Sequence, residues 1–500
     1  MCNPAGNAGD ADAPLHVVVA GAGPAGALAA LQLLCRNKGI TSRRSYRVTL
    51  VDGGRNFGLL SEEELKKNHR SWMIGLASHG IDALRTVPGL WEKYVSHVGV
   101  NLTSFALHLG SKEMKFSDPN DIGENYIVDR NFVTAAVARY LHEHFVDDEA
   151  FEACYNTKVQ YVDGPNKRVL IRGEDGVERY VHYDYILGCD GVRSAVRAAF
   201  AQHERTFEME LSDIFTSFKA IHVPRPAGVD AASLHLLPDC MPTMNGIALP
   251  ETGDMINLSA GVYNHLSCHP DMLSEDYKVV SAYMKKNFKA FELIDWDDAA
   301  RQWVGQQWNT TGQVHCNFYH SARMSALLLG DAAHATSPSI GMGMNTALKD
   351  AACLKELLDE HGDDWEAVLP AFSRERVKEG NSLTWLAYYL FSFDASQQLR
   401  IMLGLMVRTK LSKIFPSFVR PDPNQMIGRS EHKLSAVYDT ATKIGLLARV
   451  RAHNDRVRRE HFERKTGMVT GEKAWSWNSV FAVVVVAVAA AGAGAAAMLR

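Results

Sequence analysis

The residues best suited to chemistry lie between positions 327 and 351, which read LLLGDAAHATSPSIGMGMNTALKDA. The apolar run 326–329 is typical of a buried strand, and Gly330-Asp331 ends it where a polar side chain can face a ligand. The Asp331 carboxylate could accept a hydrogen bond from a hydroxyl of a ribityl chain. The first half of this segment therefore predicts contact with the chain that links a flavin ring to its phosphate.

The second half of the segment carries a G-x-G-x-N pattern at the start of a helical stretch. Gly341 and Gly343 let the backbone approach a flat ring closely. The exposed N–H groups at the helix start, near Met344 and Asn345, favour the electron-rich pyrimidine end of an isoalloxazine. Short glycine motifs also occur in a plain strand, turn and helix without a ligand, so the interpretation depends on two further segments.

The first of these segments lies near the N-terminus, where a short apolar run, 16–20, is followed at once by G-x-G-x-x-G and a helical stretch, 27–35. In that context the glycines permit a tight turn and bring the helix N-terminus to a pyrophosphate. A second strand, 47–51, ends where a ribose hydroxyl would be bound. The cofactor-binding residues predicted here are Gly21, Gly23, Ala25, Gly26 and Asp52.

The second segment is YDYILGCDGVRSAVR at 183–197, another apolar strand closing on Asp190-Gly191. Both residues are predicted to contact the cofactor. Arg193 and Arg197 follow, and either phosphate contacts or solvated helix charges would account for them.

In this order, the three segments resemble the single-component FAD-dependent aromatic hydroxylase family over about residues 15–360. Within that family, HRSWMIGLASHGIDAL (69–84) and the 183–197 segment are similar to the kynurenine 3-monooxygenase group. The resemblance implies an α/β fold: an FAD-binding Rossmann-type domain, an inserted and mostly antiparallel β-sheet substrate domain, and a C-terminal helical region.

The resemblance also implies roles for individual residues. Arg70 should reach the flavin, Arg130 in VDRNFV should contact the FAD pyrophosphate, and Asp331 should contact the ribityl chain. Pro338, with Gly343 and the rest of Gly341–Asn345, should shape the oxygen-reacting site through the backbone. His334 is given no catalytic function.

The implied reaction uses NAD(P)H and O2 to hydroxylate a small aromatic substrate through a flavin C4a-hydroperoxide, with kynurenine-like molecules among the candidates. Only one dinucleotide-binding unit is present, so NAD(P)H is expected to dock transiently. Two alternatives stay open: a membrane-bound flavin reductase, desaturase or epoxidase acting on a lipid or isoprenoid, and a tethered scaffold without turnover.

The substrate-facing residues differ from those of the kynurenine enzymes. Positions 338–345 read PSIGMGMN, where those enzymes have P-F-F-G-Q-G-M-N. Those enzymes hold the amino-acid carboxylate with an arginine and a tyrosine, and the corresponding NLTSFALHLGSKEMKF (101–116) contains neither. Lys112 or Lys115 could substitute, although a strand lysine is more often solvated.

Composition is that of an ordinary globular protein of 500 residues, 46% hydrophobic and 22% charged. The net charge of −4 gives no sign of a nucleic-acid partner. The eight cysteines show no C-x-x-C spacing, so neither a disulfide framework nor a metal site is expected.

Trp303, Trp308 and Tyr319 could line a pocket or pack in a core. The aromatic residues of 365–418 could cover the pocket, pack in a core or touch a membrane. The predicted parts are a flexible tail (1–14), an FAD-binding domain (15–95, 125–212 and 320–364), a substrate sheet (96–124 and 213–319), a helical region (365–470) and a transmembrane anchor (478–499).

The anchor prediction rests on the apolar run VFAVVVVAVAAAGAGAAAML at 480–499, which is long enough to span a bilayer as a helix of ~20 residues. Trp475 and Trp477 would lie at the interface, and the arginines upstream would keep the catalytic body on the cytosolic side of the endoplasmic reticulum or mitochondrial outer membrane. The alternative is a buried core helix. Residues 1–14 carry no export or import signal.

Overall fold

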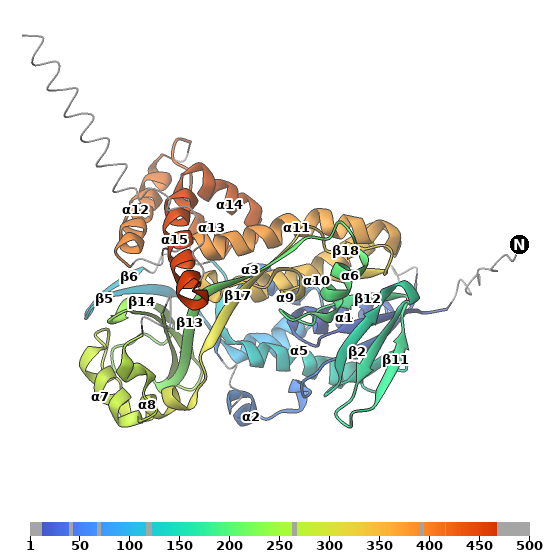
Figure 1. Cartoon of the computed structure of the whole chain (residues 1–500), viewed down its shortest axis with the longest axis horizontal. Helices are drawn as coiled ribbons and strands as arrows, with labels where there is room; N and C mark the ends of the chain where they lie inside the picture. Colours follow the sequence, from blue (N-terminus) through green and yellow to red (C-terminus); the bar gives the residue numbers. More distant parts are fainter. Residues whose placement is uncertain are drawn as a thin grey trace, which may run out of the picture. The chain divides into compact units, whose positions relative to one another are not determined.

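The computed structural model describes residues 13–39, 44–67, 72–116, 123–262, 268–390, 392, 395–415 and 417–467 (Figure 1). Its contacts group the chain up to Asn454 into one unit and the chain from Asp455 into another. The site described below belongs entirely to the first unit. Residues 1–12, Arg70 and the predicted anchor at 478–499 lie outside the described residues.

A six-stranded sheet forms the centre of the FAD-binding part, in the order β18-β19-β12-β1-β2-β8. All neighbours pair in parallel except β18 and β19. Strand β1 has neighbours on both sides and its residues 17–20 are buried, which is why it reads as an unbroken apolar run. The bounds are β1 (Leu15–Ala20), β2 (Tyr46–Val51), β8 (Phe151–Cys154), β12 (Tyr185–Gly188), β18 (His320–Ser321) and β19 (Ala326–Leu328).

Helices follow the strands of this sheet, and α1 packs against both α5 and α10. The α/β prediction is therefore confirmed. The helices of this part are α1 (Pro24–Arg36), α2 (Glu62–Lys67), α3 (Ser78–Arg85), α5 (Arg130–Phe145), α6 (Ala195–His203), α9 (Asp331–His334) and α10 (Gly343–Glu360), with a π-helical turn at Trp91–Val95.

A second, seven-stranded sheet has the order β17-β13-β16-β15-β14-β5-β6 and is antiparallel except between β14 and β5. Most of β13 and all of β15 and β16 lie within 213–319, part of the range predicted for the substrate sheet. Helices α7 and α8 also lie in this range and cover one face of the sheet, burying Trp303. The bounds are β5 (Ser104–Leu109), β6 (Lys112–Phe116), β13 (Met209–Pro224), β14 (Ser233–Met241), β15 (Met244–Glu251), β16 (Met255–Val262), β17 (Asn309–Cys316), α7 (Tyr277–Asn287) and α8 (Trp296–Gly305).

Two smaller sheets complete the strands. One places β7 (Asn125–Asp129) between β3 (Met73–Ala77) and β4 (Gly99–Asn101), and the other is a meander of β9 (Lys158–Asp163), β10 (Arg168–Arg172) and β11 (Glu178–His182).

Helices form the region that follows, where Trp365, Phe372, Tyr388 and Tyr389 are buried and Phe415 and Phe418 are exposed. Trp303 and Trp308 meet edge to face at 5.5 Å. Trp303 and Tyr319 are buried core residues, and Trp308 is half-buried against the same cluster as Trp303. No helix within the described ranges is both long and apolar enough to cross a bilayer. The helices are α11 (Trp365–Tyr389), α12 (Ala395–Ile414), α13 (Pro423–Ile427), α14 (Leu434–Lys443) and α15 (Leu446–Thr466).

Candidate functional site

The three sequence motifs meet at one edge of the parallel sheet, because each follows the carboxyl end of a neighbouring strand. The N–H of Cys189, after β12, donates to the Ala20 carbonyl of β1 at 2.7 Å. The N–H of Leu329, after β19, donates to the Gly188 carbonyl of β12 at 2.9 Å. The carboxyl edge of an open parallel sheet is where such folds bind ligands. Residues separated by three hundred positions thus form one site.

The glycines of the first turn serve three different purposes. Gly21 has φ +101°, and a Cβ there would lie 2.2 Å from the Cys189 carbonyl oxygen. A Cβ on Gly26 would lie 2.0 Å from the Gly21 oxygen, so this glycine is required for packing. At Gly23, by contrast, no atom of the described residues lies within 4 Å of such a Cβ, and no side chain caps α1 there. This open helix N-terminus is suited to a pyrophosphate.

Asp52 lies at the end of β2, as predicted, and is already tied to the turn. Its Oδ2 accepts a hydrogen bond from the Ala22 N–H at 2.7 Å, and its Oδ1 accepts one from the Gly54 N–H at 2.6 Å. A carboxylate can accept about four hydrogen bonds, so ribose hydroxyls can still bind it. Asp52 therefore orients the glycine turn, and its contact with a ribose stays a prediction.

Asp190 offers an acceptor atom that lacks a partner. Its Oδ2 accepts from the Ala195 N–H at 2.6 Å at the start of α6, whereas its Oδ1 is buried with no hydrogen-bond partner among the described residues. Burial raises the pKa of this carboxyl. A buried acceptor without a partner is costly, and a ligand hydroxyl would satisfy it. Gly191, at φ +77°, makes the turn that follows.

Arg197 connects the second motif to the third. Its guanidinium is buried and donates to the Ala332 carbonyl at 2.7 Å and the Val192 carbonyl at 2.5 Å, and burial lowers its pKa. Its burial shows that it is not a solvated helix charge, and its two hydrogen bonds to carbonyls show that it joins the second motif to the third. Contact with a phosphate stays a prediction. Arg193 is exposed.

The third motif packs directly on the first. Gly330 has φ +57°, and a Cβ there would lie 3.4 Å from the Ala25 Cβ and 3.2 Å from the Ala347 Cβ. Asp331 begins the short helix α9 and is exposed at its start. The structure thus leaves the Asp331 carboxylate accessible to a ligand.

The turn before α10 is held open by a buried asparagine. Pro338–Ile340 forms one 3-10 turn, and Gly341 follows with φ +67°; a Cβ at Gly341 would meet no atom of the described part of the chain within 4 Å. The Asn345 side chain is fully buried: its Oδ1 accepts from the Ala77 N–H at 2.9 Å, and its Nδ2 donates to the Gly75 and Gly341 carbonyls at 2.8 and 3.0 Å. Asn345 is therefore a positioning residue whose side chain is occupied.

The start of α10 has no side-chain cap within the described residues, although Met342 occupies the N-cap position. Gly343 and Met344 form its first turn and are half-buried. Elsewhere, α5, α7, α8 and α11 are capped by aspartates. Helices α3 and α14 also lack a side-chain cap, but the starts of α1 and α10 lie within the motifs. Their N–H groups fit a ligand with a pyrophosphate at one end and an electron-rich ring at the other.

A buried ionic network connects the third motif to α10 and α11, and it was not predicted from the sequence. Asp350 accepts hydrogen bonds from the Gly330 N–H at 2.8 Å, from His334 Nε2 at 2.6 Å and from Arg376 Nε at 2.6 Å. Burial alone would raise the pKa of Asp350, but His334 and Arg376 outweigh it and lower this pKa. His334 is thus a buried partner of Asp350.

Helix α11 packs against the turn that precedes α10. Ser339 Oγ donates to the Ala387 carbonyl at 2.6 Å, and Ile340 and Met342 share an apolar cluster with Leu386 and other residues of α11. Trp385, in the same cluster, stacks on Tyr389 with ring centroids 5.3 Å apart. Trp385, Tyr388 and Tyr389, near the end of α11, therefore share one apolar cluster with Ile340 and Met342.

Three basic residues proposed for ligand contacts have different positions. Arg130 begins α5, with its guanidinium 4.7 Å from the centroid of the Trp72 ring, and its pyrophosphate contact stays a prediction. Lys115 is exposed and forms an ion pair with Asp230, and Lys112 is also exposed.

Comparison with known proteins agrees with this geometry. The FAD binding domain family matches residues 14–384. Violacein synthase of Chromobacterium violaceum is 26% identical over 424 residues, covering 81% of this chain and 92% of that protein. Kynurenine 3-monooxygenase of Saccharomyces cerevisiae is 25% identical over 418 residues, covering 80% and 85%.

Among solved structures, the tetrameric form of 2-methyl-3-hydroxypyridine-5-carboxylic acid oxygenase is similar in fold, with a TM-score of 0.58 and 18% identity, covering 75% of this chain and 90% of that one. The residues that meet at the sheet edge fit FAD, since they combine an open pyrophosphate turn, a buried acceptor and an open glycine turn. The chain belongs to the FAD binding domain family, among the FAD-dependent aromatic monooxygenases, and is an FAD-dependent monooxygenase.

Proposed function

We propose that this protein hydroxylates a small, electron-rich aromatic substrate with NAD(P)H and O2. The observation that carries the proposal is the apolar cover of α11 over Ile340 and Met342, directly beside the open Gly341 turn. An aromatic ring fits between apolar walls, and a covered site limits the entry of water. The named activities of the two relatives support the same class.

Bound FAD supplies electron transfer from NAD(P)H and the activation of O2, and the residues of this chain supply binding, orientation and exclusion of water. Gly23 and Asp52 would hold the pyrophosphate and ribose, and Asp190 and Asp331 the ribityl chain. Pro338 and Gly343 would shape the site of oxygen transfer through their backbone. Asn345 fixes the Gly341 turn, so the ring is met by a preformed surface.

We further propose that apolar contacts, rather than a carboxylate clamp, hold the substrate. The 101–116 segment contains neither arginine nor tyrosine, and Lys115 is already paired with Asp230. Ile340 and Met342 are the candidate contacts. Kynurenine is consequently one test substrate among other aromatics. The lipid oxidoreductase and the scaffold are not favoured, because the matching family is an FAD binding domain and one of the relatives is a kynurenine 3-monooxygenase.

A stopped-flow screen tests this proposal. The FAD-loaded full chain is mixed with NADPH or NADH under anaerobic conditions, alone and with kynurenine, indoles, hydroxylated benzoates or an isoprenoid lipid. We expect at least one aromatic compound to accelerate flavin reduction. Acceleration by the lipid alone would contradict the aromatic assignment, and acceleration by kynurenine above all others would contradict the apolar mode of binding.

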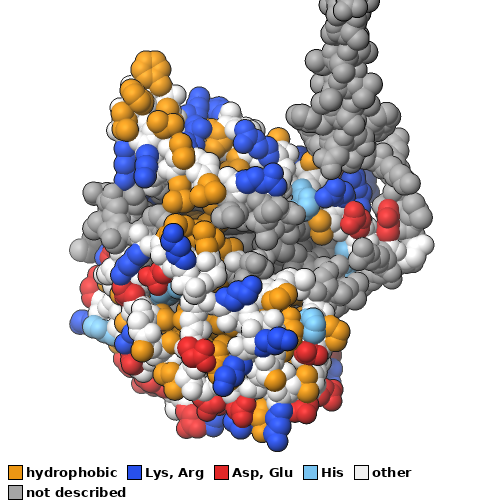
Figure 2. Space-filling model, turned by 90° about the vertical axis from the view of Figure 1, so that its left-hand side faces the viewer, with side chains coloured by type: hydrophobic (Ala, Val, Ile, Leu, Met, Phe, Trp, Pro, Cys, Tyr) orange, Lys and Arg blue, Asp and Glu red, His pale blue; other side chains and the backbone are white. Residues whose placement is uncertain are grey.

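We also propose membrane attachment through residues 478–499, with the catalytic part on the cytosolic side of the endoplasmic reticulum or the mitochondrial outer membrane. A stripe on α12 and the turn after it supports a lipid surface as partner: six large apolar side chains are exposed there at helical spacing, and the chain from 395 to 420 contains no acidic residue. Figure 2 shows hydrophobic side chains together with Lys and Arg on this face. The apolar residues are Leu403, Val407, Leu411, Ile414, Phe415 and Phe418, and the basic ones are Arg400, Arg408, Lys410, Lys413 and Arg420.

Vesicle flotation of the full chain tests how much residues 478–499 and the stripe on α12 each contribute to membrane binding. Val484→Arg combined with Val486→Arg should abolish stable insertion, because each charge at a helix centre costs roughly 2.5–3.5 kcal/mol on insertion scales. Leu411→Glu with Phe418→Glu should reduce binding to phosphatidylserine vesicles more than to phosphatidylcholine vesicles. Val177→Glu, at another exposed apolar residue, is the matched control. Wild-type protein that stays with the unbound fraction would refute attachment.

A further inference from the structure

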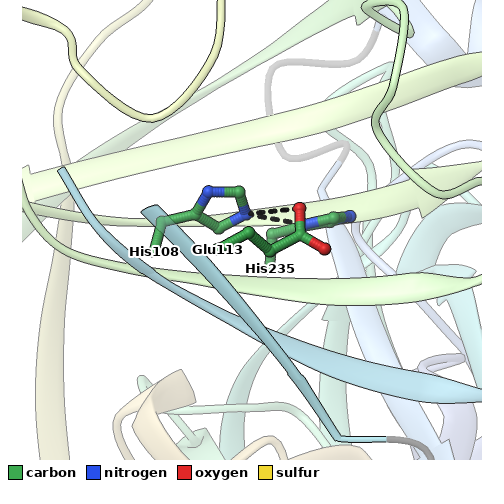
Figure 3. Close-up of side chains that lie close together, drawn as sticks. All are labelled: His108, Glu113 and His235. Atoms are coloured by element: carbon green, nitrogen blue, oxygen red, sulfur yellow. Dashed lines mark hydrogen bonds and ion pairs between the residues drawn. The ribbon is translucent and has the colours of Figure 1, made fainter. Parts of the chain in front are cut away.

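Two histidines and a glutamate meet at one edge of the seven-stranded sheet (Figure 3). His108 Nε2 lies 2.9 Å from His235 Nδ1 and 3.6 Å from a carboxylate oxygen of Glu113. One ligand atom from each of the three residues lies within 4.8 Å of the others. No sequence motif indicates this cluster, because its three residues come from three different strands and follow no short ligand spacing.

The strand register explains why the three side chains converge. His108 on β5 is directly opposite Glu113 on β6, so both point to the same face. His235 on β14 pairs with Ala106, two residues before His108, which places it on that face as a diagonal neighbour. The cluster is thus fixed by backbone pairing.

This face is separate from the FAD site. Leu237, two residues after His235, packs under α7 and α8. The alternate residues Phe105 and Leu234 point to the opposite face, where they pack with Met73 and Ile127 of the small sheet. The cluster therefore has a purpose unrelated to flavin contacts.

The spacing of the three ligand atoms matches a tetrahedral metal ion. Zinc binds nitrogen at about 2.0–2.1 Å, which places neighbouring tetrahedral ligand atoms roughly 3.3–3.4 Å apart. Two of the three separations, 2.9 and 3.6 Å, bracket that value, and all three ligand atoms lie within 4.8 Å of one another. The two histidine rings are buried, and Phe291 packs against both at 5.8 and 6.4 Å.

The chemistry of the ligands agrees with the geometry. Neutral imidazole is the form that binds metals. The Glu113 side chain is 35% exposed, which leaves a path for an ion and for a water molecule at a fourth position.

We propose that His108, His235 and Glu113 bind a divalent transition metal, with Zn²⁺ as the fitting ion, and that this ion clips β5, β6 and β14 together. Two imidazoles and one carboxylate are a ligand set that zinc accepts. The ion would stabilise this edge of the sheet rather than take part in oxygen transfer.

Isothermal titration of the metal-free full chain with Zn²⁺ tests the proposal. We expect one ion per chain, and His235→Asn or His108→Asn should weaken binding by about tenfold or more, since each removes a ligand. Because those residues are buried, Glu113→Gln at the exposed position is the variant that keeps the fold intact. Zn²⁺ should raise the Tm of the wild type and raise that of Glu113→Gln much less.

His182→Asn, at an exposed histidine of β11, is the matched control and should leave binding unchanged. The described cysteines are free thiols, so Co²⁺ difference spectra identify the ligands. Intense ligand-field bands without thiolate charge transfer support the site. Thiolate bands, equal affinity in Glu113→Gln, or no binding by the wild type would each overturn it.

Discussion

The Nδ2 group of Asn345 donates a hydrogen bond to the Gly341 carbonyl at 3.0 Å, across the turn that opens α10. The same amide group bridges to Gly75 and Ala77 of β3, so the turn is fixed to a strand 270 positions away. This relationship makes Asn345 a positioning residue for the flavin surface.

Replacing Asn345 by Ala should therefore loosen the Gly341 turn and weaken FAD binding. The loss leaves the Ala77 N–H and two carbonyls without partners, and each such buried group costs about 1–3 kcal/mol. FAD affinity from flavin fluorescence and urea unfolding of the metal- and flavin-free chain measure the two effects. Asn257→Ala, at a fully buried asparagine of β16, should reduce stability and leave FAD affinity unchanged. Equal FAD affinity in Asn345→Ala would contradict the positioning role.

Two alanine substitutions in the first turn should separate folding from cofactor binding. Gly23→Ala meets open space, so the chain should fold normally, while the new methyl group occupies the pyrophosphate position and lowers FAD affinity. Gly26→Ala would place its Cβ 2.0 Å from the Gly21 oxygen and should lower Tm even without FAD. Differential scanning fluorimetry with and without FAD distinguishes the two. A Gly23→Ala protein with wild-type FAD affinity would show that the pyrophosphate lies elsewhere.

Breaking the buried network around Asp350 should lower the free energy of unfolding. Asp350→Asn leaves the buried Arg376 without its charge partner, and removing one partner of a buried pair costs roughly 3–5 kcal/mol. The exposed ion pair of Glu63 with Lys67 provides the control, and Glu63→Gln should cost much less. Comparable losses in the two variants, measured by urea unfolding, would disprove the importance of the buried network.

The Asp350 carboxyl should also make the stability of the folded protein depend on pH in a defined direction. Its pKa is lowered in the folded protein from its ordinary value of 3.8, so its stabilisation is complete above that value and is lost as pH falls through the folded pKa. The difference in free energy of unfolding between wild type and Asp350→Asn should stay at roughly 3–5 kcal/mol between pH 5 and 7. It should shrink below about pH 4. A difference that shrinks as pH rises would contradict the sign.

A substitution in the predicted substrate wall should change catalysis without changing FAD affinity. Ile340→Ala removes apolar contact beside the turn, and lost methylene groups in such pockets reduce kcat/KM by about 10–200-fold. FAD affinity should stay unchanged, and more NAD(P)H should be consumed without hydroxylated product, because the substrate fits loosely. Ile294→Ala, at an exposed isoleucine, is the control. Tight coupling in Ile340→Ala would place the substrate elsewhere.

The parts of the site that the sequence predicts are the ones encoded locally. Gly21, Gly26 and Gly330 are recognisable because a strand, a required glycine and a helix follow one another within a few residues. The role of Arg197 could not be predicted in this way, because its carbonyl partner at Ala332 is 135 positions away. The Asp350–Arg376 network and the His108–Glu113–His235 cluster depend on strand register and helix packing, which local periodicity does not contain.

Oxygen incorporation under ¹⁸O2 tests the central claim most directly. The FAD-loaded full chain is incubated with NAD(P)H and the aromatic compound that accelerates flavin reduction most strongly, and the product is analysed by mass spectrometry. We expect one ¹⁸O atom per product molecule, with NAD(P)H consumed in equal amount. NAD(P)H consumption that yields only hydrogen peroxide, or product oxygen that comes from water, would contradict it.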